Sequence, residues 1–172
     1  MRTSEEFNYI DDLLNSPFQY GLFTGDMLSK VEACYIIHGC NAQGVMGSGI
    51  ARLIREKWPQ VYTEYRGNYE YHGLNLGDII PVQVTNHLVI VNCITQDNYG
   101  SEKRHVNYEA IMNCAERLNK FVPNNSIIHT PLIGAGLAGG DWPIIEKILT
   151  RTLKPKLAIW ALTKAAYEEA CK

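Results

Sequence analysis

Two short groups of residues in the first third of the chain have types that suit ligand chemistry. Polar side chains come first and glycines follow directly: His38, Cys40 and Asn41, then Gly44, Gly47 and Gly49. Glycine permits positive φ and lets backbone N–H groups approach a ligand closely. Residues 33–37 have the apolar, β-branched composition of a buried strand, and residues 50–57 that of a helix. Helix N-termini attract phosphate groups, so the stretch predicts a strand, an anion-binding loop and a helix.

The spacing of these glycines matches neither of the two best-known nucleotide-binding loops. A P-loop requires Lys and then Ser or Thr after its last glycine, and Ile50 and Ala51 stand there instead. The dinucleotide fingerprint is G-x-G-x-x-G, whereas Gly44, Gly47 and Gly49 form the pattern G-x-x-G-x-G. Glycine loops also join strands to helices where nothing binds. Taken alone, the loop leaves both interpretations open.

A second glycine-rich segment repeats the arrangement near the C-terminal end. Residues 134–142, G-A-G-L-A-G-G-D-W, follow a predicted strand over 126–133 and precede a predicted helix over 143–153. Ligands of open α/β sheets bind at the carboxyl ends of strands. Two loops at two such ends are expected to face each other across one cleft, which fits a nucleotide that contains pyrophosphate.

These loops require an alternating series of strands and helices to position them. Strands are also predicted over 19–23, 78–84, 88–95 and 156–162, and helices over 106–121, after Pro59 and after 162. The strands over 78–84 and 88–95 form an expected antiparallel pair. The alternation predicts an α/β fold: a three-layer α/β/α domain with a mixed, largely parallel central sheet.

Composition limits the number of domains and the class of partner. The chain has 172 residues, of which 46% are hydrophobic, and this suits a single domain over residues 18–172. Residues 1–17 are expected to form an acidic appendage with a short helix over 4–14, capped by Ser4. A net charge of −2 disfavours duplex nucleic acid as a partner. The polar segment 96–105 is expected to border a site, and tyrosines 62, 65, 69 and 71 are expected to pack on their own domain.

Cysteine usage and hydropathy indicate the compartment. Five scattered cysteines without zinc-ligand spacing indicate reduced thiols, so neither a metal nor a cofactor is expected. No apolar run approaches the roughly 18 residues of a membrane span. The protein is therefore expected in the cytoplasm, without a membrane partner.

With these motifs in place, residues 20–162 resemble the macrodomain family, whose members bind ADP-ribose. The resemblance rests on Gly25-Asp26, on residues 41–51 and on residues 133–137 before Asp141-Trp142. It implies that Asp26 accepts a hydrogen bond from adenine, that Asn41 contacts the distal ribose and that the loops hold the phosphates. Two alternatives stay open: Asp26 caps residues 27–29, and Trp160 is a core residue rather than a neighbour of adenine. The implied ligand-binding residues are Thr24, Gly25, Asp26, Asn41, Gly44, Val45, Met46, Gly47, Ser48, Gly49, Ile50, Ile133, Gly134, Ala135, Gly136, Leu137, Ala138 and Trp160.

Two activities within the family are suggested by local motifs. The motif I-H-G-C-N at 37–41 is similar to the I-H-S-C-N of yeast-type ADP-ribose-1″-phosphate phosphatases, and G-G-D-W at 139–142 resembles the branch that includes terminal ADP-ribose glycohydrolases. The glycohydrolase pattern uses a lysine where this chain has Gln96, which cannot form a covalent sugar adduct. A phosphatase acting on ADP-ribose 1″-phosphate is therefore the preferred hypothesis. The alternatives are a glycohydrolase acting on ADP-ribosylated protein and a non-catalytic reader of ADP-ribose.

Three residues are the catalytic candidates: His38, Asn41 and Asp141. Asp141 would orient or deprotonate the attacking water and His38 would protonate the leaving ribose oxygen, or the two roles are exchanged. Asn41 would lie beside the terminal phosphate. The structural alternatives are that His38 is buried and that Asp141 only caps a helix. Asp97 and His105 are reserve candidates.

Overall fold

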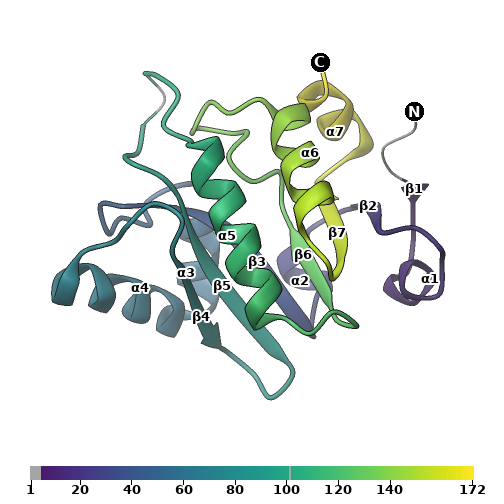
Figure 1. The fold of residues 1–172 in the computed structure, drawn as a ribbon, viewed down its shortest axis with the longest axis horizontal. Helices are drawn as coiled ribbons and strands as arrows, with labels where there is room; N and C mark the ends of the chain where they lie inside the picture. The colour runs from purple at the N-terminus through teal and green to yellow at the C-terminus, as the bar shows by residue number, and fades with distance from the viewer. Residues whose placement is uncertain (1–4, 101) are drawn as a thin grey trace.

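A seven-stranded sheet forms the centre of the molecule in a computed structural model that describes residues 5–100 and 102–172 (Figure 1). The strand order is β1-β2-β7-β6-β3-β5-β4, and among these strands of the described residues only the pair of β4 and β5 is antiparallel. The predicted mixed, largely parallel sheet is confirmed. The strands are β1 (Glu5–Glu6), β2 (Tyr20–Thr24), β3 (Cys34–Asn41), β4 (Ile79–Gln83), β5 (Leu88–Gln96), β6 (Ile127–Thr130) and β7 (Lys156–Ala161).

Helices cover both faces of the sheet, as the three-layer prediction requires. In Figure 1, α5 and α6 cross the near face, and α2, α3 and α4 lie behind the sheet. Each face has its own core, with Ile111 and Ile145 in one and Ile54 and Val61 in the other. The helices are α1 (Ile10–Leu14), α2 (Met27–Lys30), α3 (Gly49–Lys57), α4 (Pro59–His72), α5 (Tyr108–Phe121), α6 (Trp142–Thr152) and α7 (Lys164–Ala170).

Strand β3 is longer than the prediction, which ended it at residue 37. His38, Cys40 and Asn41 lie inside the strand, because residues up to Asn41 pair with β5, with a shift of register between Cys40 and Asn41. Strand β6 is shorter than predicted and its pairing with β3 ends at Ile36 and His129. Beyond this pair, β3 continues to Asn41 without a partner in β6. Helix α4 is also longer than the short helix expected after Pro59.

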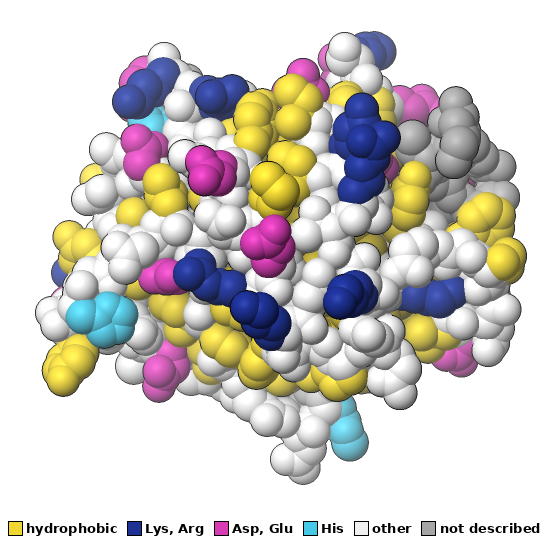
Figure 2. Space-filling model, in the orientation of Figure 1, with side chains coloured by type: hydrophobic (Ala, Val, Ile, Leu, Met, Phe, Trp, Pro, Cys, Tyr) yellow, Lys and Arg dark blue, Asp and Glu magenta, His cyan; other side chains and the backbone are white. Residues whose placement is uncertain are grey.

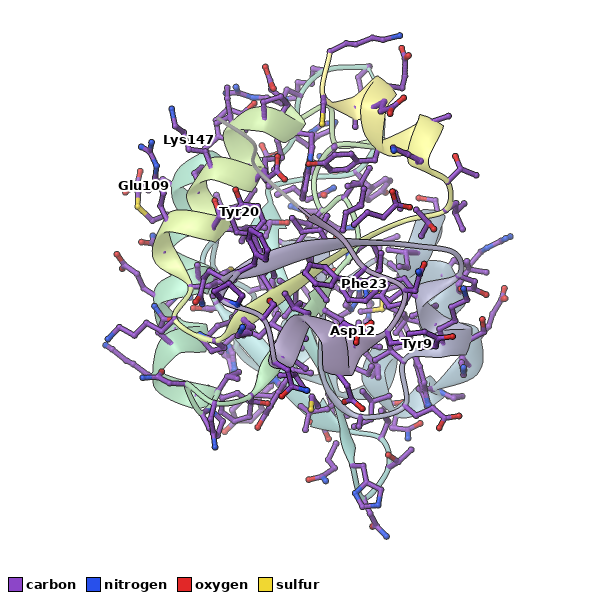
Figure 3. The ribbon with its side chains drawn as sticks, turned by 90° about the vertical axis from the view of Figure 1, so that its right-hand side faces the viewer. Tyr9, Asp12, Tyr20, Phe23, Glu109 and Lys147 are labelled. Carbon is purple, nitrogen blue, oxygen red and sulfur yellow. The ribbon has the colours of Figure 1, made fainter. Side chains whose placement is uncertain are left out.

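The N-terminal segment differs in part from the predicted helix over residues 4–14. Glu5–Glu6 is a strand parallel to β2, because the backbone at the edge of β2 offers free hydrogen-bonding groups, and α1 begins only at Ile10. The predicted cap, Ser4, lies outside the described residues. Phe7 stacks on Phe23 with ring centroids 6.0 Å apart, and Figure 3 shows Phe23 behind this segment. The division of the chain at residue 17 stays a prediction.

The surface carries charges of both signs. Basic and acidic side chains are interspersed over the face in Figure 2, in agreement with the small net charge of −2. Within residues 5–100 and 102–172, no helix combines the length and the apolar character needed to cross a bilayer. A cytoplasmic location stays a prediction.

Candidate functional site

A cavity of about 520 Å³ opens at the carboxyl ends of β3, β5 and β6. Three segments that follow these strands form its walls: the first glycine loop (residues 42–48), the polar loop (97–107) and the second glycine loop (131–141). The two glycine loops therefore face one cavity, as the sequence predicted. The lining residues are Gly39, Cys40, Asn41, Val45, Gly47, Ser48, Gly49, Ile50, Ala51, Gln96, Tyr99, Gly100, Pro131, Leu132, Ile133, Gly134, Gly136, Leu137 and Ala138.

The side chain of Asn41 holds the first glycine loop. Its Oδ1 accepts hydrogen bonds from Gln43 N at 3.0 Å and from Val45 N at 3.3 Å, and its Nδ2 donates to Val45 O at 2.7 Å. Tyr65 Oη lies 2.9 Å from the same Oδ1. The carboxamide thus closes a turn of the loop, so that Asn41 contributes to the cavity wall both directly and through the loop.

The first glycine loop leads into α3 with its N-terminus at the cavity. Gly44 and Gly49 have φ of 76° and 59°, a region that residues with a Cβ rarely adopt. Ser48 occupies the N-cap position of α3 without a side-chain cap hydrogen bond, and residues 48–51 all line the cavity. The first N–H groups of a helix have no partner within the helix. This end of α3 is therefore suited to bind an anion.

The second glycine loop is fixed by its own backbone and by the polar loop. Gly140 N donates to Gly134 O at 2.8 Å, and His105 N donates to Ala138 O at 2.8 Å. The His105 ring lies between two carboxylates, with Nε2 3.0 Å from Glu102 Oε1 and Nδ1 3.4 Å from Asp97 Oδ1. The side chains of Asp97, Glu102 and His105 thus interact with one another within the polar loop. Neither Asp97 nor His105 lines the cavity.

His38 is not part of the cavity wall. The ring is fully buried on β3, and its Nε2 is 2.6 Å from Asn92 Oδ1. Burial lowers the pKa of His38 to about 4, against the hydrogen bond to Asn92, which raises it. The imidazole is therefore neutral at pH 7. Cys40 Sγ lies 3.6 Å from the ring, and burial raises the pKa of that thiol well above its usual value.

The residues expected to contact adenine lie outside the cavity wall. Asp26 is exposed, and its Oδ1 accepts a hydrogen bond from Leu28 N at 3.1 Å. The alternative that Asp26 caps the helix after it is thus confirmed. Trp160 is buried, stacks on Phe23 with ring centroids 5.1 Å apart and donates to His129 Nδ1 at 3.0 Å. These contacts fit the alternative in which Trp160 belongs to the core.

Asp141 lies at the end of the second glycine loop, and its carboxylate makes no cap hydrogen bond to α6. The residue occupies the N-cap position that the helix-cap alternative requires. Its N–H donates to Tyr108 Oη at 3.0 Å. The residue is exposed and is not part of the cavity wall.

The structure brings most of the predicted loop residues together and adds others. Gln96, Tyr99 and Gly100 line the cavity from the side of β5, which agrees with the expectation that the polar segment borders a site. Pro131 and Leu132 were missed because the prediction extended β6 through them. The predicted site residues that lie outside the wall are Thr24, Gly25, Asp26, His38, Gly44, Met46, Ala135, Asp141 and Trp160.

The cavity wall is neutral. Among the described residues that line it, none is Asp, Glu, Lys, Arg or His. Within residues 5–100 and 102–172, no group of three or more His, Cys, Asp or Glu is arranged to hold a metal ion. Recognition of an anion here depends on backbone N–H groups, the N-terminus of α3 and the uncharged side chains.

The chain is similar to known proteins in both sequence and structure. Residues 37–149 match the sequence profile of the Macro domain. An uncharacterized 17.5 kDa protein in the tk-vs intergenic region of Enterobacteria phage T4 is 34% identical over 143 residues, which cover 78% of this chain and 90% of that protein. A Scheffersomyces stipitis protein named ADP-ribose 1″-phosphate phosphatase is 27% identical over 157 residues, which cover 74% of this chain and 91% of that protein. A solved macrodomain protein from Streptomyces coelicolor superposes with a TM-score of 0.70 and 26% identity, covering 83% of this chain and 98% of that one.

Proposed function

Because this chain belongs to the macrodomain family, we propose that its cavity binds ADP-ribose and that the protein hydrolyses the phosphate ester of ADP-ribose 1″-phosphate. The observation that carries the proposal is the pair of glycine loops that face one neutral cavity, with the N-terminus of α3 in its wall. Backbone N–H groups directed at one point stabilise the charge of a phosphate without a cationic side chain. The yeast relative named for this phosphatase activity supports the choice of substrate.

The arrangement of the strands suits an elongated ligand. The carboxyl ends of β2, β7, β6 and β3 lie in this order along one edge of the sheet. Three strand spacings of roughly 4.8 Å separate Asp26, after β2, from Asn41, at the end of β3, or about 14 Å. We assign adenine to the side of Asp26, the pyrophosphate to the two loops and the distal ribose to the side of Asn41. The cavity then holds the part of the ligand nearest the reacting bond.

Asp141 is the proposed general base. Water attacks phosphorus in line, the bond between phosphorus and the O1″ oxygen breaks, and the Asp141 carboxylate takes a proton from the attacking water. The leaving oxygen takes its proton from solvent, and ADP-ribose and inorganic phosphate are the products. His38, which is buried and neutral, is assigned to the support of Cys40 and β3 rather than to proton transfer. The backbone N–H groups of the loops stabilise the negative charge on the transferring phosphoryl group.

The experiment is a pair of assays on one preparation. Release of inorganic phosphate from ADP-ribose 1″-phosphate is measured beside release of ADP-ribose from a glutamyl-modified protein. Phosphate release alone is the expected result, and Asp141→Asn should lower kcat by roughly 10²-fold with little change in ADP-ribose affinity. Glu109→Gln, an exposed change on α5, serves as the charge-matched control. ADP-ribose binding without either release would overturn the enzymatic proposal and leave a reader.

The neutral wall favours a second candidate, hydrolysis of an ADP-ribosyl ester on a protein. A terminal phosphate adds negative charge at the distal end, and no cationic side chain of the described residues lines the cavity to meet it. An ester at the distal ribose needs no such partner. Gln96 argues against a lysine-dependent mechanism, so Asp141 would have to act on water directly. Release of ADP-ribose without phosphate release decides for this candidate.

A further inference from the structure

Helix α4 contacts the first glycine loop from outside the cavity. Tyr65 is fully buried, and its hydroxyl oxygen lies 2.6 Å from Asn41 O and 2.9 Å from Asn41 Oδ1. From the next residue of the helix, Arg66 Nη1 donates to Gly44 O at 3.2 Å. The ring of Tyr69 comes within 2.7 Å of the point where a Cβ on Gly44 would lie. One face of α4 thus supports the loop at both its start and its glycine turn.

The Tyr65 hydroxyl acts on the loop through Asn41. It has one proton to donate and two acceptors within reach, both on Asn41. The Asn41 carboxamide in turn binds Gln43 N, Val45 N and Val45 O. Val45 lines the cavity, so a chain of hydrogen bonds runs from α4 to the cavity wall.

Packing alone does not explain why residue 65 is a tyrosine. Phenylalanine would fill nearly the same volume without a polar group to satisfy, and burying a hydroxyl without a partner is unfavourable. Burial, followed by the neighbouring Cys40, raises the pKa of Tyr65 above its usual value. The hydroxyl therefore remains a hydrogen-bond donor throughout the physiological pH range.

We propose that Tyr65 is a positioning residue of the ligand site: through Asn41, which binds the N–H groups of Gln43 and Val45, its hydroxyl holds the first glycine loop in the conformation that forms the cavity wall. The inference rests on the proposed function for the identity of the ligand. A loop fixed before binding loses less conformational entropy when the ligand arrives. Tyr65 thereby contributes to affinity without contact with the ligand.

Amide hydrogen exchange of the free protein tests the hold on the loop without any ligand. In Tyr65→Phe, exchange at the Gln43 and Val45 amides should become roughly 3- to 10-fold faster, the change expected from one lost hydrogen bond. Tyr62→Phe is the matched control, because Tyr62 lies on the same helix, is half-buried and keeps its ring under Arg55. Equal exchange in Tyr65→Phe and wild type overturns the inference.

Titration with ADP-ribose tests the consequence for binding. Tyr65→Phe should raise the Kd roughly 3- to 10-fold and Tyr62→Phe should not. In an Asn41→Ala background the effect of Tyr65→Phe on the Kd should be smaller than in wild type, because the hydroxyl then keeps its contact with Asn41 O but loses the one with Asn41 Oδ1. Additive losses would show that Tyr65 acts by general stability, and would overturn the positioning role. If wild-type protein binds no ADP-ribose, the proposed function fails, while the exchange measurement still decides whether Tyr65 holds the loop.

Discussion

Gly134 and Gly136 provide a matched pair for measuring what the second glycine loop requires of its backbone. Gly134 has φ of 74°, and an added Cβ would lie 2.8 Å from Val106 Cγ2 and 3.1 Å from Ile145 Cδ1. Gly136 lines the same cavity, and an added Cβ there would meet no atom within 4 Å. Alanine at the first position should destabilise the protein, and alanine at the second should not.

The magnitude follows from three contributions at Gly134. The left-handed conformation costs a residue with a Cβ roughly 1–2 kcal/mol, and overpacking against Val106 and Ile145 costs roughly 1–3 kcal/mol. The smaller conformational freedom of the unfolded chain with alanine returns roughly 0.4–1 kcal/mol. Gly134→Ala should therefore lower the free energy of unfolding by about 1–5 kcal/mol. At Gly136 only the last contribution applies, so that variant should equal or slightly exceed wild type.

Urea denaturation of both variants at 25 °C measures the difference, provided that the slope with urea stays the same. Thermal unfolding of the same samples gives a second measure. If the two variants unfold within about 0.5 kcal/mol of each other, the loop relaxes around Val106 at little cost, and the argument from positive φ and close contact is refuted.

Three further substitutions test individual assignments. Asp26→Ser keeps an oxygen that can accept a hydrogen bond from Leu28 N, so the free energy of unfolding should change by less than about 0.5 kcal/mol. If the carboxylate contacts adenine, calorimetry should show ADP-ribose binding weaker by about 1–3 kcal/mol. Unchanged binding would limit Asp26 to its role as a helix cap. His38→Gln should lower the melting temperature but leave kcat for phosphate release within about threefold, and a fall of about 10²-fold would identify His38 as the proton donor after all. Burial raises the pKa of Glu146 above 4.5, so the native state holds this proton more tightly than the unfolded state. Stability should therefore fall as the pH rises from about 4.5 through the raised pKa, and Glu146→Gln, which keeps an acceptor for Tyr167 Oη, should flatten the dependence of the melting temperature on pH between about 4 and 8.

The elements that local patterns define were predictable from the sequence. The antiparallel pair β4 and β5 has two β-branched, apolar segments around a short polar turn, and both strands were placed within a few residues. Helix α5 has apolar residues at helical spacing and Asn107 as its cap. The glycine loops were identified because few other backbones need glycine at such density between a strand and a helix.

What the sequence missed depends on contacts between distant segments. The polar residues at the end of β3 suggested a strand end, but His38 is satisfied by Asn92, 54 positions along the chain, and the strand continues. The N-terminal residues Glu5 and Glu6 have no β-propensity of note, and they form a strand because β2 presents an open edge to them. Neither partner is visible in a local window of sequence.

Because the cavity wall has no charged side chain among the described residues, the position of the loop backbone matters for the proposed function. Where a lysine or arginine binds phosphate, a flexible side chain can follow the ligand, and small shifts of the loop matter little. Backbone N–H groups have fixed directions, so binding by the two glycine loops depends on the residues that hold those loops in place. In this protein they include Asn41 and Tyr65 for the first loop and the hydrogen bond from His105 N to Ala138 O for the second. Residues that would carry the specificity of the site therefore extend beyond its wall, into α4 and the polar loop.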